Sequence, residues 1–352
     1  MIMKNIAAIL VFILAVNSPA LYSQIAVALH TEGEGVAREV KFYYRSDGFQ
    51  QAYADAVDGD TIYLPGGTFS PPSSIAKELV IFGAGHYPGA TTETGKTIIS
   101  GDIRLAAGAD HLHLEGLHIT GGFSTFSNNV SVNNIRVVRC LISGAISIRG
   151  DKSNPSTNIS FTGCVLASTA TNFFDNIDNL AIYNSVINGR ISGSEGNLFS
   201  NNIFFFTSSN AYLLNSSDNN TIRNSIFYHK SEWYWISGST GNSWLNNIIE
   251  VEGPRFHSTD TDAGNYKGVA FSPVFADQNG SAFSYEDDYS LVNPEAYTGT
   301  DGKQVGIYGG VFPYREMAIP VIPNISSSSV SPTTGPDGNL NIEITVEAQN
   351  EN

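Results

Sequence analysis

The stretch LHLEGLHI (112–119) is the first of seven similar segments that decide the fold. Each segment alternates apolar with other residues, then usually has a small or turn-forming residue, then Leu, Cys, Ser or Asn, and ends on an apolar residue. The other six are IRVVRCLI (135–142), ISFTGCVL (159–166), LAIYNSVI (180–187), NLFSNNIF (197–204), NTIRNSIF (220–227) and NSWLNNII (242–249). Such a repeat at a nearly fixed period indicates a solenoid.

The sixth position of the segments sets the register of this repeat. It falls at Leu117, Cys140, Cys164, Ser185, Asn202, Ser225 and Asn247, so the spacings are 23, 24, 21, 17, 23 and 22 residues. Asn or Gly stands just before it at Gly116, Gly163, Asn184, Asn201, Asn224 and Asn246. Both residue types tolerate left-handed backbone angles, so the chain can bend there between two short strands.

One segment is therefore one turn of a coil. Stacked turns bury their in-facing Leu, Ile, Val and Phe in a continuous core and pair almost every strand edge. We predict an all-β fold, a right-handed parallel β-helix solenoid of roughly ten coils spaced by one strand separation. A short helix over 49–57, after Ser46-Asp47-Gly48 with its N-cap candidate, is expected to cover the N-terminal end of the core.

Two further segments carry a resemblance to a known family. With the stacked Asn and Ser positions, AVDGDTIYLPGGTF (56–69) and GTDGKQVGIYGGVFP (299–313) resemble secreted bacterial β-helix proteins of the pectate-lyase-like superfamily, over roughly residues 40–325. The resemblance implies the fold. It leaves the activity open, because polysaccharide lyases, glycoside hydrolases, adhesins and phage tailspikes share this architecture.

The ends of the chain predict its processing and its domains. Lys4, an apolar run and a small-residue site at 18–20 make residues 1–20 a signal peptide, so the protein is expected to be secreted: extracellular, at the cell surface or periplasmic. The run is too short to span a bilayer, which predicts no membrane insertion. The β-helix domain is expected over 21–325, with regular coils at about 61–250 and an irregular end at 251–313. Residues 326–352 are expected to form a Ser-rich linker and a C-terminal strand.

Charge and cysteine content exclude some classes of protein. The formal net charge of −15 argues against a nucleic-acid partner, which needs clustered Lys and Arg. Cys140 and Cys164 occupy the same in-facing position in successive coils. Their Cβ vectors should point the same way, which fits a disulfide poorly, so we predict two buried thiols.

The main candidate site lies in the sixth and seventh coils, around Arg223, FYHKSEWYWI (227–236) and Glu250. Exposed aromatic rings stack on sugars, and titratable groups beside them can move protons. The candidates are Tyr228, His229 and Lys230 as proton carriers, Arg223 and Arg255 as carboxylate ligands, Glu232 and Glu250 as an acid/base pair, and Trp233 and Trp235 as sugar-stacking rings. The alternative that both tryptophans point inward and the charges are only solvated stays open.

Metal binding is a weaker hypothesis. His111, His113 and Glu115 alternate with buried leucines and could ligate a transition metal, but Arg136 is expected directly above His113 and opposes a second cation. A polar ladder is therefore favoured. DTDAG (260–264) resembles a calcium loop only weakly, and an Asp-rich turn is favoured. No cofactor is therefore predicted, and calcium stays open without a specific motif for it.

These observations lead to a hypothesis for function. The protein is expected to bind an extracellular polysaccharide and, if it is an enzyme, to cleave it as a lyase. One alternative is a glycoside hydrolase that uses Glu232 and Glu250. The other is a non-catalytic structural or adhesive β-helix protein of the cell surface or matrix.

Overall fold

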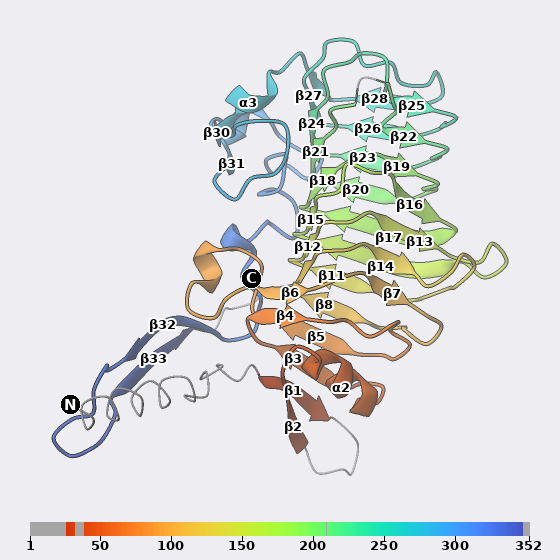
Figure 1. Ribbon diagram of the computed structural model, residues 1–352. Helices are drawn as coiled ribbons and strands as arrows, with labels where there is room; N and C mark the ends of the chain where they lie inside the picture. The colour runs from red at the N-terminus through yellow and green to blue at the C-terminus, as the bar shows by residue number, and fades with distance from the viewer. Residues whose placement is uncertain (1–25, 32–38, 209, 348–352) are drawn as a thin grey trace, which may run out of the picture.

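The computed structural model describes residues 26–31, 39–208 and 210–347. These residues form an all-β parallel solenoid of about nine turns (Figure 1). The predicted parallel β-helix is confirmed, and the number of turns is close to the ten expected. The predicted signal peptide over 1–20 lies outside the described residues.

Three long sheets run along the solenoid, and each turn contributes up to one strand to each sheet. Sheet A orders its strands as β2 (Glu39–Tyr44), β1 (Ala26–Thr31), β3 (Thr61–Leu64), β5 (Val80–Gly83), β8 (His113–Glu115), β11 (Arg136–Val138), β14 (Ser156–Thr162), β17 (Ile177–Tyr183), β20 (Leu198–Ser200), β23 (Thr221–Arg223), β26 (Ser243–Leu245) and β28 (Thr261–Ala263). Sheet B runs β4 (Gly67–Phe69), β6 (Thr97–Ile99), β9 (His118–Ile119), β12 (Leu141–Ile142), β15 (Val165–Leu166), β18 (Val186–Asn188), β21 (Ile203–Phe205), β24 (Ile226–Tyr228), β27 (Ile248–Ile249) and β29 (Tyr266–Lys267). Sheet C runs β7 (Ile103–Leu105), β10 (Phe123–Thr125), β13 (Ile146–Arg149), β16 (Asn172–Asp175), β19 (Ile191–Ser192), β22 (Leu214–Asn215) and β25 (Ile236–Ser237).

The predicted register is confirmed at the two cysteines. Leu141 pairs with Val165 in parallel, so Cys140 and Cys164 lie on adjacent turns. Both are free and completely buried. Burial raises the pKa of Cys164 to about 12. The two residues therefore act as small apolar core side chains, as expected.

A ladder of buried Ser and Asn side chains continues from the cysteines along the sixth position. Each side chain accepts a hydrogen bond from the backbone N–H of the same position one turn earlier. The bonds are Cys164 to Ser185 (3.0 Å), Ser185 to Asn202 (3.0 Å), Asn202 to Ser225 (3.0 Å), Ser225 to Asn247 (2.9 Å) and Asn247 to Asn265 (2.8 Å). The ladder thus gives hydrogen-bond partners to backbone N–H groups inside the bends, which strand pairing does not reach.

The ladder extends one turn beyond the predicted end of the regular coils. Asn265 is its last member, and β28 and β29 pair with β26 and β27 in the parallel register. The boundary at about 250 was therefore too early. The sequence hides this turn because Asp262 occupies a strand position where the earlier turns carry apolar residues.

Antiparallel elements close the N-terminal end. Helix α2 (Gly48–Asp55) forms where a helix was predicted, and it buries Phe49 and Ala52 against the core. Strand β1 pairs antiparallel with both β2 and β3. β1 and β2 were not predicted from the sequence.

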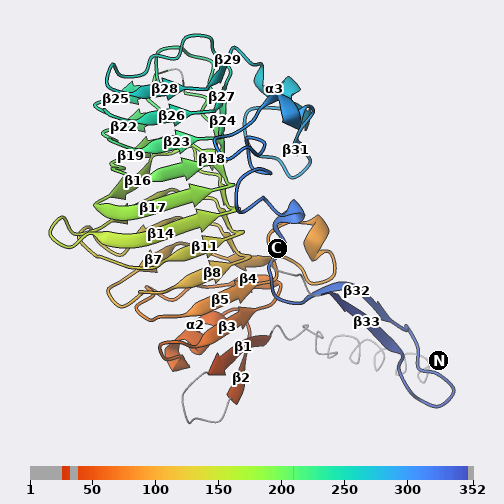
Figure 2. The same ribbon diagram turned by 180° about the vertical axis from the view of Figure 1, so that it is seen from behind.

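The chain after the last turn covers sheet B and then projects from the solenoid. Helix α3 (Phe271–Val274) and the pair β30 (Phe275–Asp277) and β31 (Asp288–Leu291) bury apolar side chains against the outer side of sheet B. Strands β32 (Asn324–Val330) and β33 (Ile342–Glu347) form an antiparallel hairpin (Figure 2). The Ser-rich stretch predicted as a linker is thus largely strand β32. Single 3-10 turns occur at η1 (Gly89–Thr91), η2 (Pro294–Ala296) and η3 (Glu316–Ala318).

Candidate functional site

The asparagines at the left-handed bends hold a segment from the far end of the chain. This segment, residues 298–321, is called the strap, and it runs back along the bends in the opposite order to the turns. The hydrogen bonds are Asn246 Nδ2 to the Thr298 carbonyl (2.9 Å), the Thr300 N–H to Asn224 Oδ1 (2.8 Å), Asn201 Nδ2 to the Gly306 carbonyl (3.2 Å), and Asn184 Nδ2 to the carbonyls of Ile307 and Gly309 (both 2.7 Å). Each asparagine thus makes the bend and binds the strap.

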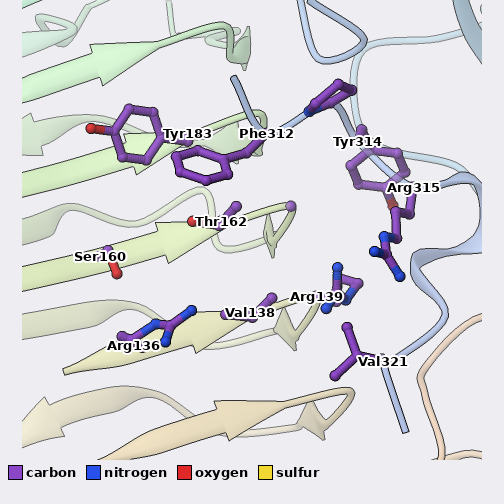
Figure 3. A pocket seen from close by; sticks show the side chains of 12 residues that line it. Arg136, Val138, Arg139, Ser160, Thr162, Tyr183, Phe312, Tyr314, Arg315 and Val321 are labelled. Atoms are coloured by element: carbon purple, nitrogen blue, oxygen red, sulfur yellow. The ribbon is translucent and has the colours of Figure 1, made fainter. Parts of the chain in front are cut away.

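The row of asparagines stops after Asn184, and a cavity opens there. The next three bends carry Gly163, Arg139 and Gly116. Gly163 has no side chain to bind the strap, whereas at Gly116 a side chain would collide with Pro320 of the strap. Between these points a cavity of about 450 Å³ separates the strap from the outer face of sheet A (Figure 3). Its walls include three arginines and three aromatic residues: Arg136, Arg139, Arg315, Tyr183, Phe312 and Tyr314. We call it the arginine cavity.

Arg139 is fixed by a buried carboxylate at the floor of the arginine cavity. Its backbone has a φ of 50°, a conformation that the other bends give to Asn or Gly. Its Nη2 donates to Oε1 of Glu115 at 2.7 Å. Glu115 is only 1% exposed and also accepts hydrogen bonds from His113 (3.1 Å) and from the Val321 N–H (2.7 Å). Glu115 and its three partners, Arg139, His113 and Val321, therefore join two turns to the strap. We call this group the clamp.

The ionised form of Glu115 is favoured by this clamp. Burial alone would raise the pKa of its carboxyl group. The hydrogen bond from His113, the charge of Arg139 and the Val321 N–H outweigh burial and lower the pKa. Glu115 therefore neutralises part of the positive charge of Arg139.

Arg136 and Tyr314 add an unpaired cation and an unpaired donor. Arg136 lies directly above His113 in the register, as predicted, and its exposed guanidinium has no carboxylate partner among the described residues. Tyr314 is 7% exposed, and its hydroxyl lacks a hydrogen-bond partner within the described part of the chain. Burial raises the pKa of Tyr314 well above its ordinary value, so the hydroxyl stays protonated and can donate.

Aromatic rings form the upper wall. Tyr183 on β17 and Phe312 of the strap meet edge to face, with ring centroids 5.4 Å apart. Figure 3 shows Phe312 beside Tyr183, and Arg139 close to Arg315 on the side of Tyr314. A ligand that enters meets positive charge at one end and apolar ring surface at the other.

The structure separates the two tryptophans of the predicted site. Trp235 is completely buried between the rings of Phe227 and Trp244, and its Nε1 donates to the Ser231 carbonyl at 2.8 Å. No ring face of Trp235 is left for a sugar. Trp233 is 58% exposed, and the guanidinium of Arg255 lies 3.0 Å from its ring centre. Arg255 therefore covers one face of the only one of these two rings that reaches the surface.

Four other predicted residues of these turns are divided between a cavity and sheet A. Tyr228, His229 and Lys230 line a cavity of about 250 Å³, with the Lys230 ammonium 5.1 Å from the Tyr228 ring centre. Arg223 lies on β23 of sheet A, and its Nε donates to the Ser200 hydroxyl at 3.3 Å.

Glu232 and Glu250, the predicted acid/base pair, are not hydrogen-bonded to each other among the described residues. Partial burial raises the pKa of Glu250, and the charge of Lys230 opposes this rise. Glu232 is exposed and lies beside Gly253. Within the described ranges no hydrogen bond connects Glu232 with Glu250.

The candidate metal ligands are occupied by other partners. His111 lies 3.2 Å from Glu78, while His113 and Glu115 bind each other. Among the residues that the structure describes, no group of three His, Cys, Asp or Glu side chains could hold a metal ion. In DTDAG, Asp260 accepts hydrogen bonds from Asn242 and Trp244, and Asp262 pairs with Lys267 at 2.5 Å.

Sequence reasoning missed Arg139 and the whole strap side of the arginine cavity. One signal was present: Arg139 stands at the bend position where the six other segments have Asn or Gly. Phe312 lies in the quoted closing motif, and Tyr314 and Arg315 follow it, but no repeat register relates them to β11 or β17.

Comparison with family models, with curated proteins and with solved structures finds no match for this chain. In the described part of the chain, none of the helices is both long and apolar enough to cross a bilayer.

Proposed function

We propose that this protein binds an acidic extracellular polysaccharide, with one acidic group of the polymer in the arginine cavity. The observation that carries the proposal is the gathering of Arg136, Arg139 and Arg315 around one cavity in a chain of net charge −15. Guanidinium groups bind carboxylates through paired hydrogen bonds, which makes arginine the preferred residue for this recognition.

The surroundings of the arginines support selectivity. The acidic protein as a whole repels a polyanion, so attraction is confined to the cavity. The Tyr314 hydroxyl adds an uncharged donor, and Phe312 and Tyr183 offer apolar surface to the sugar ring. Such a site distinguishes a sugar acid from a simple inorganic anion.

Binding without cleavage is the version that these contacts favour. A lyase needs a base beside the sugar carboxylate, and the nearest carboxylate, Glu115, is ionised but buried under Arg139. Tyr314 keeps its proton and is therefore a donor rather than a base. Membership of the pectate-lyase-like superfamily and secretion remain proposals, and turnover assays test the alternative that the protein is an enzyme. A lyase would produce UV-absorbing unsaturated ends, and a hydrolase would produce reducing ends without them.

Binding of polygalacturonate, alginate and hyaluronan, with a neutral glucan as reference, tests the proposal. At least one acidic polymer should bind and the glucan should not bind at the arginine cavity. Arg136→Gln should weaken acidic-polymer binding about tenfold, the equivalent of ~1.4 kcal/mol. Arg104→Gln, which removes an exposed arginine from sheet C, is the matched control and should have no effect. Equal effects of the two variants, or no binding to any acidic polymer, would reject the proposal.

A further inference from the structure

A second cavity, separate from the arginine cavity, lies beside the ends of β21 and β24 in sheet B. Its volume is about 250 Å³. The rings of Phe206 and Tyr228 and the hydroxyl groups of Thr207, Ser231 and Ser281 are among its walls. Ser281 comes from the loop between β30 and β31, so two distant parts of the chain build this cavity. We call it the histidine cavity after His229.

His229 contributes an imidazole nitrogen that no described residue hydrogen-bonds. The residue is 1% exposed, and its ring packs between Phe206 and Trp235 with centroid distances of 5.0 and 4.8 Å. Within the described ranges, its Nε2 has no hydrogen-bond partner. Buried polar atoms are nearly always paired, so an unpaired nitrogen in a cavity wall points to a ligand group.

The imidazole is neutral under ordinary conditions. Burial lowers the pKa of His229 to about 4, although the nearby backbone of Tyr234 and Phe206 acts in the other direction. A neutral imidazole offers one donor and one acceptor, which suits a hydroxyl group better than an anion.

The rim of the histidine cavity carries balanced charge. Lys230 is the charged residue in the cavity wall. A hydrogen bond from its ammonium group to Tyr228 and, to a smaller extent, the opposite charge of Glu250 raise its pKa. The arginine cavity, in contrast, has three arginines in its walls, and among the described residues the guanidinium of Arg136 has no carboxylate partner. The two cavities are therefore built for ligands of different charge.

We infer that the histidine cavity binds an uncharged sugar ring, with a hydroxyl on Nε2 of His229 and the ring against Phe206 and Tyr228. Ligand pockets of about 300–1,000 Å³ hold drug-sized molecules, so a cavity of 250 Å³ suits a single ring. Serine and threonine hydroxyls in the wall match the remaining hydroxyls of a sugar. This inference does not depend on the acidic-polymer proposal.

Titration calorimetry of the full chain with the methyl glycosides of glucose, galactose, mannose, xylose and N-acetylglucosamine tests the inference. At least one glycoside should bind. His229→Phe keeps an aromatic ring between Phe206 and Trp235 but removes Nε2, and it should weaken binding at least tenfold. Thr207→Val changes only an exposed wall hydroxyl and should weaken binding even if the His229 variant does not fold.

Two further measurements keep this inference separate from the proposed function. Arg136→Gln should leave glycoside binding unchanged, and His229→Phe should leave acidic-polymer binding unchanged. The ¹⁵N shift of His229 Nε2 should move when the glycoside is added, a response that a purely structural histidine would not give. No binding of any glycoside, or binding that neither wall variant weakens and that leaves the Nε2 shift unchanged, overturns the inference and means that only water fills the cavity.

Discussion

Nδ2 of Asn184 lies 2.7 Å from the carbonyl oxygen of Ile307, although 123 residues separate the two in the chain. The same nitrogen reaches the Gly309 carbonyl. Asn184 has a φ of 47°, so one residue both turns the coil and anchors the strap. The arginine cavity exists because the bends below Asn184 do not repeat this contact.

Asn184→Gly should destabilise the fold by about 2 kcal/mol, because two buried hydrogen bonds of about 1 kcal/mol each are lost while the left-handed backbone is retained. Urea unfolding measures the change. Asn158→Gly is the matched control, since Asn158 also has a positive φ but carries an exposed amide, and it should cost much less. Equal losses would show that the strap contacts contribute nothing.

Glu115→Gln should destabilise the fold by about 3 kcal/mol, because the mostly buried Arg139 loses its counter-charge. Amide hydrogen exchange should speed up at Val321, which donates to the same carboxylate. Adding Arg139→Asn should recover part of the loss, since asparagine restores the residue type of the other bends. A double variant less stable than the single one would contradict the clamp described here.

Acid should weaken the fold through His86 and His229. Burial lowers the pKa of His86 to about 3 and that of His229 to about 4, against about 6.5 in the unfolded chain. The unfolded state therefore binds more protons below pH 6.5, so stability is highest above that pH and falls as pH drops toward 4. His229→Phe should remove part of this slope, up to ~1.4 kcal/mol per pH unit. An unchanged slope in this variant would mean that His229 titrates normally.

Phe312→Ala should weaken acidic-polymer binding about tenfold and change stability little, because the ring is half exposed at the mouth of the arginine cavity. Phe126→Ala removes a similarly exposed ring just after β10 of sheet C, and it should not affect binding. Isothermal calorimetry with the bound polymer compares the two variants. A loss shared by both would show that the ring of Phe312 makes no specific contact.

The repeat made the solenoid predictable, because apolar alternation and a left-handed residue at each bend are local properties of the sequence. The register followed from the sixth position, which places Cys140 beside Cys164. The turn that ends at Asn265 was not predicted, because its strand carries Asp262 in place of an apolar residue. The serine run was not predicted to be strand β32, because serine has no strand pattern of its own and the strand depends on pairing with β33.

The candidate sites were harder to predict, because they depend on contacts between distant segments. Tyr228, His229 and Lys230 do line a common cavity, as their closeness in sequence suggested. Alternation could not tell which of Trp233 and Trp235 points inward, since a connection between turns has no fixed period. The arginine cavity needs the strap, and no local pattern links Tyr314 or Arg315 to Arg139.

A crystal structure of the full chain with a bound uronate oligosaccharide tests whether the arginine cavity binds an acidic sugar. We predict a sugar carboxylate at about 2.8 Å from a guanidinium nitrogen of Arg136, Arg139 or Arg315, with its ring near Phe312. An oligosaccharide bound elsewhere on the solenoid, with the arginine cavity holding only water, would contradict it.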